Sequence, residues 1–567
     1  MPPSRRRFLK TLPVALGAGV SVPVQARQLS TRISKSTLEC QEALTGFEFN
    51  DAEHELMLGL VNANREHYDA IRDVNLPPET EPAFSFRPVC PTKPKQRAAP
   101  NAKGALPPLA GARVSPSIEQ LAFESAARLG QLIAARAVSS TDLTRMYLDR
   151  LTRLDSRLSC VITLASSLAL EQAAQADADI KAGRRHGPLH GVPYGVKDLF
   201  ATNGIRTTWG AKPYEHQVFD YDATVVERLR AAGAVLVAKL TTGELAIGDL
   251  WFGGQTRNPW KPDTGSDGSS AGPAAAVAAG LVGFSIGRET GGSIVTPSST
   301  CGVVGLRPSY GRVSRHGVMA LRWTLDKVGT IARTVQDCSL ALSVIYGPDG
   351  RDETVSDLPF AWMPGAPSLA GLRIGYVQAE FIDGPEHASW EERSRWDARR
   401  GVHAAALDVL RGAGAELEPI ELPNLPAPSL YSVLNAEAGA MFDDLVRTGQ
   451  VRELAGKGPN QRANQLRAAR FIPAIEYIRA QRVRTLLIQR MNALFANIDA
   501  FVSPSSSASM TMTNLTGHPA IVVKSGFVDG MPEALMITGP LYDEATILRI
   551  AHAYEQRTPW KDRHPNL

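Results

Sequence analysis

The stretch TVVERLRAAGAVLVAKL, residues 224–240, shows the pattern that decides the fold class. Its first half is typical of a helix, a Gly-Ala pair at 233–234 interrupts it, and its second half is an apolar run typical of a buried strand. The same order of helix, glycine and strand returns in ALDVLRGAGAELEPIEL, residues 406–422. Alternating helices and strands predict an α/β architecture in which helices cover most of a central sheet.

Other segments fit this architecture. The runs LRIGYVQAE (372–380) and DAFVSPSS (499–506) predict short apolar strands. Residues 118–136 predict an amphipathic helix. A second helix is expected to begin at Ser139, because Ser139 and Asp142 have the spacing of a capping box.

The chain begins with MPPSRRRFLKTLPVALGAGVSVPVQA, residues 1–26. A basic segment precedes a short apolar stretch, and the residues 24–26 offer a small-residue cleavage pattern. The apolar stretch is shorter than the roughly 20 residues that span a bilayer. Because SRRRFLK (4–10) resembles the twin-arginine export signal, we expect a periplasmic or secreted protein. The alternative is a basic tail ahead of a buried helix.

Residues 27–115 form a second segment. Its part NDAEHELMLGLVNANREHYDAIRDV (50–74) has apolar residues at helical spacing and predicts a peripheral helix capped by Asn50 or Asp51. The later part is rich in Pro, Ala, Lys and Gly without an apolar period, which predicts a linker or an extended arm. The main domain is then expected to occupy residues 116–567.

Charge and cysteine content limit the classes of protein. The formal net charge is +4, and removal of residues 1–26 takes away four positive charges and no negative one, which leaves zero. A nucleic-acid partner requires a basic excess, so we expect none. No later segment is long and apolar enough for stable membrane insertion. The five cysteines are scattered, so we expect free buried thiols, with a Cys40–Cys90 disulfide as the alternative.

Several common motifs are missing or lie in the wrong context. Two G-x-S-x-G matches, GSSAG (268–272) and GFSIG (283–287), lack the strand–turn–helix context of a nucleophile elbow. The chain has no GxxxxGK[ST] and no GxGxxG, so no phosphate-binding loop is expected. The eleven histidines include no HExxH pair, and we expect neither a metal nor another cofactor.

One lysine and one serine are unusual. In LHGVPYGVKDLF (189–200), Lys197 follows a mostly apolar, strand-like run, where an ammonium group is costly unless it is paired or neutral. The ordinary interpretation is an ion pair with the adjacent Asp198. In GRETGGSIVTP (287–297), glycines expose backbone N–H groups beside the hydroxyl of Ser293, which taken alone is typical of a turn.

Together, Lys197, GSDGSSAG (265–272) and TGGS (290–293) resemble the amidase signature family of Ser–Ser–Lys hydrolases. GVPYGVKD (191–198) matches the lysine motif of that family, and the resemblance is dense from about residue 187 to residue 340. It returns further along the chain, in residues 514–527 and 542–555. The resemblance implies an α/β/α sandwich with a central mixed sheet flanked by helices. It also implies hydrolysis of a carboxylic amide, or an ester, of a small molecule.

The resemblance further implies a role for each residue of the site. Lys197 would be the base and Ser293 the nucleophile, since a serine hydroxyl is weak at neutral pH without a base. Ser269 would be the bridging serine, preceded by a cis peptide bond, 24 residues before Ser293. Four backbone N–H groups would bind the developing oxyanion: those of Thr290, Gly291, Gly292 and Ser293.

The sequence departs from the family pattern beside these residues. Glu289 stands where the family commonly has an aspartate, and Arg288 where it has a small residue. Val295 and Thr296 stand where some members carry an arginine. We expect these departures to reshape the substrate pocket. Its walls are expected to come from distant segments: Met319, Trp323 and the helical region 430–480.

Two other functions remain open at this point. The first resembles the A component of a tRNA-dependent amidotransferase, which requires partner chains; the export signal and the neutral mature charge count against it. The second is a binding protein that retains the fold without catalysis, against which stands the presence of all three side chains of the Ser–Ser–Lys set. A homodimer is also left open.

Overall fold

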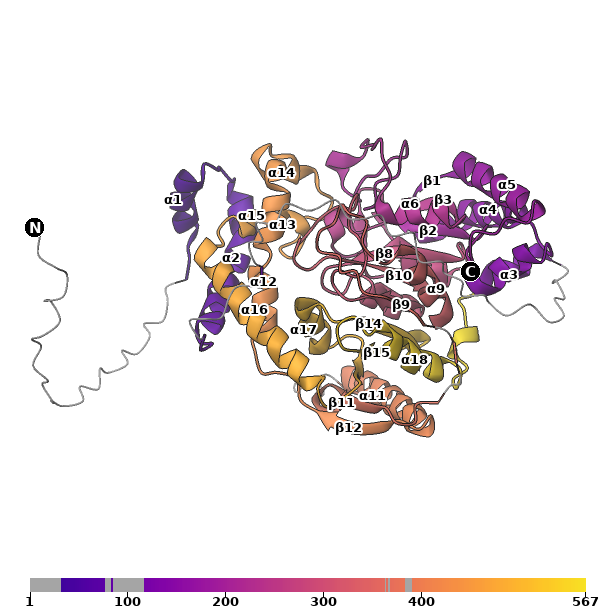
Figure 1. The fold of residues 1–567 in the computed structure, drawn as a ribbon. Helices are drawn as coiled ribbons and strands as arrows, with labels where there is room; N and C mark the ends of the chain where they lie inside the picture. Colours follow the sequence, from indigo (N-terminus) through magenta and orange to yellow (C-terminus); the bar gives the residue numbers. More distant parts are fainter. Residues whose placement is uncertain (1–31, 77–82, 85–116, 363, 366–367, 383–389) are drawn as a thin grey trace, which may run out of the picture.

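The structure is a computed structural model of the chain (Figure 1). It describes residues 32–76, 83–84, 117–362, 364–365, 368–382 and 390–567. The export signal, the Pro-rich linker and Cys90 lie outside the described residues, so these predictions stay predictions.

The strands of the described part are β1 Val161–Leu164, β2 Pro193–Lys197, β3 Val235–Leu240, β4 Leu250–Trp251, β5 Gly254–Gln255, β6 Arg257–Asn258, β7 Lys261–Gly265, β8 Phe284–Glu289, β9 Val304–Arg307, β10 Lys327–Ala332, β11 Arg373–Val377, β12 Glu416–Ile420, β13 Ala500–Pro504, β14 Ala520–Val528 and β15 Met531–Thr538.

The α-helices of the described part are α1 Lys35–Thr45, α2 Asp51–Arg72, α3 Ala126–Ala134, α4 Ser140–Leu158, α5 Ser166–Lys181, α6 Thr224–Ala231, α7 Ala271–Ala278, α8 Val295–Cys301, α9 Val335–Ile345, α10 Gln378–Ile382, α11 Trp390–Gly412, α12 Ala427–Val433, α13 Ala436–Met441, α14 Asp443–Arg447, α15 Arg462–Ala469, α16 Ala474–Leu494, α17 Ala508–Thr516 and α18 Glu544–Glu555.

Eleven of the described strands form one mixed sheet in the order β1-β3-β2-β8-β10-β9-β14-β15-β13-β11-β12. The neighbours β3, β2 and β8 run parallel, as do β13, β11 and β12, whereas the strands between these groups pair antiparallel. The carboxyl ends of parallel neighbours meet at the same edge of a sheet. The ends of β2 and β8, which carry the motifs singled out above, therefore lie side by side.

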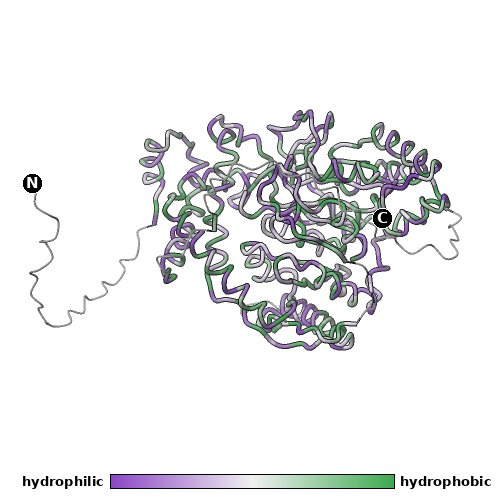
Figure 2. Tube along the Cα trace, in the orientation of Figure 1, coloured by the Kyte–Doolittle hydropathy of each residue, from purple (hydrophilic) through white to green (hydrophobic). Residues whose placement is uncertain are grey.

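Helices cover both faces of this sheet. Along β3, Val235 and Val237 pack with α5 and α7, whereas Leu236 points to the opposite face and packs with α6. This alternation follows from the two-residue period of a strand, and both faces are apolar because both are buried. In Figure 2 the surrounding helices alternate between hydrophilic and hydrophobic colours along their turns, as expected for helices with one face against a sheet. The predicted α/β/α sandwich with a central mixed sheet is confirmed.

The element that decided the fold class forms as expected. Residues 224–240 give α6 and β3, and residues 406–422 give the end of α11 followed by β12. Ser139 caps α4 and accepts from the N–H of Asp142, as predicted. The prediction of a single helix over residues 118–136 is wrong, because a short 3₁₀ helix, Ile118–Phe123, precedes α3. The chain is extended at Ser125, whose side chain caps α3 by accepting from the N–H of Arg128.

The N-terminal extension contributes α1 and α2. A full capping box starts α2, in which Asn50 accepts from the N–H of Glu53 while Glu53 accepts from the N–H of Asn50. In Figure 1 this helix lies beside α12, α15 and α16, which follow more than half a chain later, and it contacts all three. The predicted helix and its cap are confirmed.

Of the cysteines, Cys160, Cys301 and Cys338 are buried free thiols, as expected, while Cys40 is exposed. Its proposed pairing with Cys90 falls outside the described residues. Within the described ranges, every helix is too short or too polar to cross a membrane.

Candidate active site

Lys197 is the last residue of β2, between β3 and β8, and its side chain is fully buried. The expected ordinary partner, Asp198, does not pair with it. Asp198 instead forms an ion pair with Lys239 of β3 at 3.0 Å and accepts hydrogen bonds from the N–H and hydroxyl of Thr208, both at 2.6 Å. The interpretation of Lys197 as the ion-pair partner of Asp198 is therefore wrong. Among the described residues, Lys197 has no carboxylate at ion-pair distance.

The amine of Lys197 contacts hydroxyl groups instead. Its Nζ lies 2.8 Å from Ser269 Oγ and 3.1 Å from Ser270 Oγ, and it donates to the carbonyl of Arg288 at 3.3 Å. Burial, and after it the nearby Arg288 guanidinium, lower the pKa of Lys197 well below its ordinary value. A lysine in this environment favours the neutral amine, which is the form that can accept a proton.

The two serine loops lie against each other beside this amine. The Gly268–Ser269 peptide bond is cis, as the family resemblance implies. The N–H of Ser270 donates to the carbonyl of Ser293 at 3.0 Å, which ties the loop after β8 to the loop before α7. Ser293 itself is half-buried, and within the described residues its hydroxyl makes no hydrogen bond to Ser269 or Lys197. Lys197 and Ser269 are thus in direct contact, and Ser293 lies in the adjoining loop.

Ser270 is a site residue that the sequence reasoning missed. Besides its contact with Lys197, its hydroxyl donates to the carbonyl of Arg288 at 3.3 Å. The sequence could have indicated this residue, since Ser270 directly follows Ser269 in GSSAG. By contrast, Ser285 of the second G-x-S-x-G match lies inside β8, where it donates to the carbonyl of Pro273. No nucleophile elbow forms there.

The loop after β8 presents free backbone donors. Within the described residues, the N–H groups of Gly291, Gly292 and Ser293 have no hydrogen-bond acceptor. Thr290 is fixed through its side chain, which accepts from Arg288 Nη1 and donates to Asp326 Oδ1, both at 2.6 Å. Preorganised N–H groups of this kind can stabilise negative charge on an oxygen atom.

Glu289 anchors this loop rather than lining a substrate pocket. Its Oε2 accepts from the N–H groups of Ile294 and Val295 at 2.7 and 2.9 Å, and its Oε1 accepts from Arg307 and Asn514, each at 2.8 Å. Burial alone would raise the pKa of Glu289, but Arg307 and the hydrogen bonds outweigh it, and the pKa is lowered. The carboxylate is therefore charged, and both of its oxygens are held by hydrogen bonds within the protein.

Two walls of the site come from helices far along the chain. A Cβ atom placed on Gly291 would lie 2.3 Å from the hydroxyl oxygen of Tyr431, a residue of α12. One placed on Gly292, which has φ +122°, would lie 3.0 Å from the sulfur of Met510 in α17. Only glycine fits this approach of backbone to side chain at either position. Tyr431 falls in the expected region 430–480, whereas Met510 was missed.

Two of the other residues expected as pocket walls lie at one cavity, whose lining does not include Lys197, Ser269 or Ser293. Met319 and Trp323 line a cavity of about 280 Å³ with Arg288 and Asp326. Trp323 is exposed, while Arg288 is fully buried. The indole ring is thus open to solvent, and the guanidinium is enclosed by protein contacts.

For metal binding, the described residues offer one group of three candidate ligands, Glu39, Asp51 and His54, in the N-terminal extension. Asp51 already pairs with Lys35 there. None of these residues belongs to the serine–lysine cluster.

The fold just described, a large mixed sheet flanked by helices, is shared with known proteins. The Amidase family model matches residues 142–513, and the chain belongs to this family. The A component of glutamyl-tRNA(Gln) amidotransferase from Roseiflexus sp. (strain RS-1) is 37% identical over 481 residues, which cover 76% of this chain and 95% of that protein.

Solved structures show the same fold. The native peptide amidase from Stenotrophomonas maltophilia is similar with a TM-score of 0.69 and 30% identity, over 79% of this chain and 99% of that one. An amidase family protein from Bacillus anthracis str. Ames is similar with a TM-score of 0.68 and 25% identity, over 79% and 94% of the two chains.

Proposed function

We propose that this protein hydrolyses the C–N bond of a linear carboxylic amide of a small molecule, or the corresponding ester bond, through an acyl-serine intermediate. One observation carries the proposal. The amine of Lys197 is fully buried, has no carboxylate partner among the described residues, and lies 2.8 Å from the hydroxyl of Ser269. An unpaired buried lysine is costly for folding, so its presence beside a serine favours a chemical role.

The reaction starts with proton transfer. Ser269 passes its proton to the neutral amine of Lys197 and receives the proton of Ser293, whose Oγ attacks the carbonyl carbon of the substrate. The oxygen of that carbonyl becomes negative and is bound by the N–H groups of Gly291, Gly292 and Ser293. The approach of Ser293 to Ser269 is expected to tighten when substrate binds, as is common for catalytic hydrogen bonds.

The intermediate then collapses. The C–N bond breaks, and the proton held by Lys197 returns through Ser269 to the leaving amine, which departs neutral. Water attacks the acyl group on Ser293, with Ser269 and Lys197 again accepting the proton. The carboxylic acid leaves and the free serine is restored.

The test is the variant Ser293→Ala, measured on a panel of aryl, aliphatic and peptide amides. Turnover should fall by about 10⁴-fold or more, because an acyl-enzyme can no longer form. The melting temperature should stay near that of wild type, since Ser293 is half-buried in a loop. Full activity of this variant on every substrate that wild type hydrolyses would disprove the nucleophile.

A silent binding protein on the same fold is a rival function, and labelling separates it from the enzyme. A fluorophosphonate probe should label wild type at Ser293 and leave Ser293→Ala unlabelled. Failure of the wild-type protein to react would favour the silent protein.

The relatives named as the A component of glutamyl-tRNA(Gln) amidotransferase support a second candidate function, that of one chain of an amidotransferase complex. That function needs partner chains to use the released ammonia. The purified chain alone should then be inactive on simple amides and gain glutamine hydrolysis only with its partners. Robust hydrolysis by the isolated chain favours the amidase.

We also propose export by a twin-arginine route, supported by SRRRFLK (4–10) and the apolar stretch behind it. Fractionation of cells that express the full chain should place it outside the cytoplasm. Replacing Arg5 and Arg6 by lysine should retain it inside. Light scattering of the purified protein tests the homodimer, which stays a prediction.

A further inference from the structure

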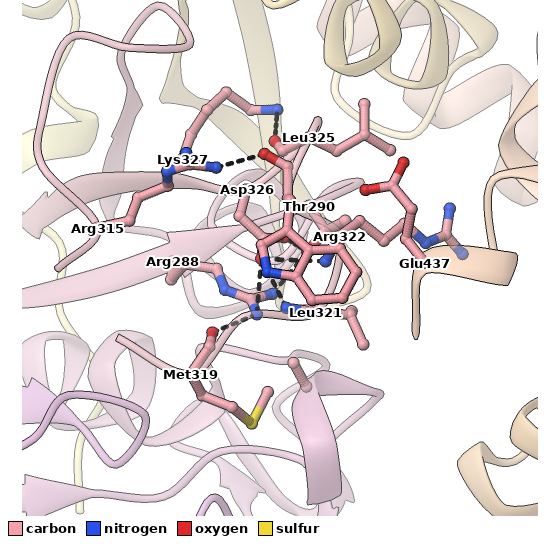
Figure 3. A network of polar contacts seen from close by, with 12 residues as sticks. Arg288, Thr290, Arg315, Met319, Leu321, Arg322, Leu325, Asp326, Lys327 and Glu437 are labelled. Carbon is pink, nitrogen blue, oxygen red and sulfur yellow. Dashed lines mark hydrogen bonds and ion pairs between the residues drawn. The ribbon is translucent and has the colours of Figure 1, made fainter. Parts of the chain in front are cut away.

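Arg288 is the buried residue that joins the lysine to the oxyanion loop. It lies on β8 next to the anchoring Glu289, and its side chain is fully buried. Its guanidinium forms an ion pair with Asp326 at 3.2 Å and donates to Thr290 Oγ1 at 2.6 Å and to the carbonyl of Met319 at 2.8 Å. Figure 3 shows this network, with Arg288 reaching toward Met319 on one side and Asp326 on the other.

The same residue contacts the proposed base from its other end. The carbonyl of Arg288 accepts from Lys197 Nζ at 3.3 Å and from the hydroxyl of Ser270, also at 3.3 Å. One residue thus fixes the position of the amine through its backbone and that of Thr290 through its side chain. Asp326 completes the unit, because it accepts from the N–H groups of Leu321 and Arg322 as well as from Thr290.

The charges around Lys197 oppose one another. Burial lowers the pKa of Lys197, the Arg288 cation lowers it further, and the carboxylates of Asp326 and Glu289 raise it. Arg288 in turn faces Asp326 and the hydroxyl of Tyr431, together with the cations Arg315 and Arg322. An arginine stays charged in proteins, and a like charge acts strongly where water is excluded.

We infer that Arg288 is a positioning residue for the proposed reaction: its backbone carbonyl and its guanidinium hold the Lys197 amine and the start of the oxyanion loop in one rigid unit. The inference rests on the proposed function. Arg288 does not touch the reacting atoms, and it acts through Lys197 and Thr290. The ion pair with Asp326 partly neutralises the charge of Arg288 and so reduces its effect on Lys197.

The experiment measures kcat/KM against pH, from about pH 6 to about pH 10, for wild type, Arg288→Met, Arg288→Lys and Asp326→Asn. Methionine removes the cation at similar length. The low-pH limb of the profile should move to higher pH, with activity lower by about tenfold or more at neutral pH and largely recovered near the alkaline end. Arg288→Lys keeps a charge and should stay close to wild type.

Asp326→Asn supplies a change of opposite sign. It removes the carboxylate that offsets Arg288, so the low-pH limb should move to lower pH. A residue with a purely structural role would not give opposite shifts in the two variants. Arg312→Met is the matched control, because Arg312 is also a fully buried arginine in an ion pair, with Glu544 at 2.7 Å, and it makes no contact with Lys197. Its limb should not move, whatever its stability.

The inference is overturned if Arg288→Met loses the same factor at every pH, or if the limbs of Arg288→Met and Asp326→Asn stay in place or move in the same direction. If Arg288→Met does not fold, the shift of the low-pH limb in Asp326→Asn tests the inference by itself. Should the wild type show neither turnover nor labelling of Ser293, the proposed function fails. Carbon-13 NMR of the lysine ε-carbons, assigned with Lys197→Met, then still measures the titration of Lys197. An unchanged titration in Arg288→Met would overturn the inference, and a titration moved to higher pH would support it.

Discussion

Two buried lysines on neighbouring strands, Lys197 on β2 and Lys239 on β3, have opposite surroundings. Both side chains are fully buried. Lys239 pairs with Asp198 at 3.0 Å and also donates to Thr207 and to a backbone carbonyl. Lys197 contacts serine hydroxyls and no carboxylate in the described structure. Burial lowers the pKa of both, but Asp198 counteracts this for Lys239. The counter-ion therefore separates a structural lysine from a candidate base.

A third lysine shows that a missing counter-ion is not sufficient. Lys327 on β10 is buried, and burial followed by Arg307 lowers its pKa well below the ordinary value. Its amine donates to the carbonyls of Leu325 and Asn514, and the described structure gives it no serine hydroxyl. A base needs both a neutral amine and a hydroxyl that can pass it a proton, and only Lys197 of these three lysines combines them.

The largest expected effect is on turnover. Lys197→Met should lower kcat by roughly 10⁴-fold or more, since loss of a proton acceptor in such a unit is about as costly as loss of the nucleophile. Lys327→Met tests whether any buried lysine has this effect, and it should leave far more activity. Equal losses in the two variants, measured on the same amide and corrected for folded fraction, would remove the distinction drawn above.

The next effect is on stability and belongs to the other lysine. Lys239→Met leaves Asp198 buried without its cation and should lower the free energy of unfolding by about 3–5 kcal/mol. Urea denaturation measures this. Adding Asp198→Asn to the same variant should recover part of the loss, because the unpaired charge is then gone. If the single variant is as stable as wild type, the pair does not have the structural role assigned to it.

A smaller loss of activity is expected from Gly291→Ala. The added methyl group would meet the Tyr431 ring and displace the loop, which should lower kcat/KM by up to about 100-fold. Replacing Tyr431 by alanine in the same chain should restore part of it. Gly59→Ala, where the new Cβ meets open space, is the control and should not change activity. An unaffected Gly291→Ala would mean that Tyr431 yields without moving the loop.

The smallest effect is the pH dependence of stability. The folded pKa of Lys197 lies below its unfolded value, so between the two values the unfolded chain binds more protons and stability rises with pH. The cost of the buried amine is therefore greatest at lower pH and vanishes above the unfolded pKa. Lys197→Met lacks this cost and should melt a little higher than wild type at neutral pH, with the gap closing as pH increases. Calorimetry across this range would contradict the assignment if the gap were constant.

Much of the site was predictable because its motifs are local in sequence. The helix–glycine–strand pattern predicted β3 and β12, and the apolar run before Lys197 predicted a buried strand end. The resemblance to the amidase signature family, carried by GSSAG and TGGS, implied where the hydroxyls and backbone donors would lie. What failed locally was the helix over 118–136, because a capping serine starts a new helix within an otherwise helical pattern.

The sequence by itself determined that Lys197 would end a buried strand, since apolar patterning is a property of a short segment. The resemblance to the amidase signature family implied that the serine loops lie beside it. Only the tertiary structure decided its partner. Lys197 and Asp198 are adjacent in the chain, and an ion pair between them was the ordinary interpretation of the lysine taken alone, but successive residues of an extended segment point to opposite sides. Asp198 therefore forms an ion pair with Lys239 of the next strand, and the amine of Lys197 contacts the serine hydroxyls instead. The walls from Tyr431 and Met510 and the contact of Arg288 with Asp326 likewise depend on packing between distant segments, which no local pattern encodes.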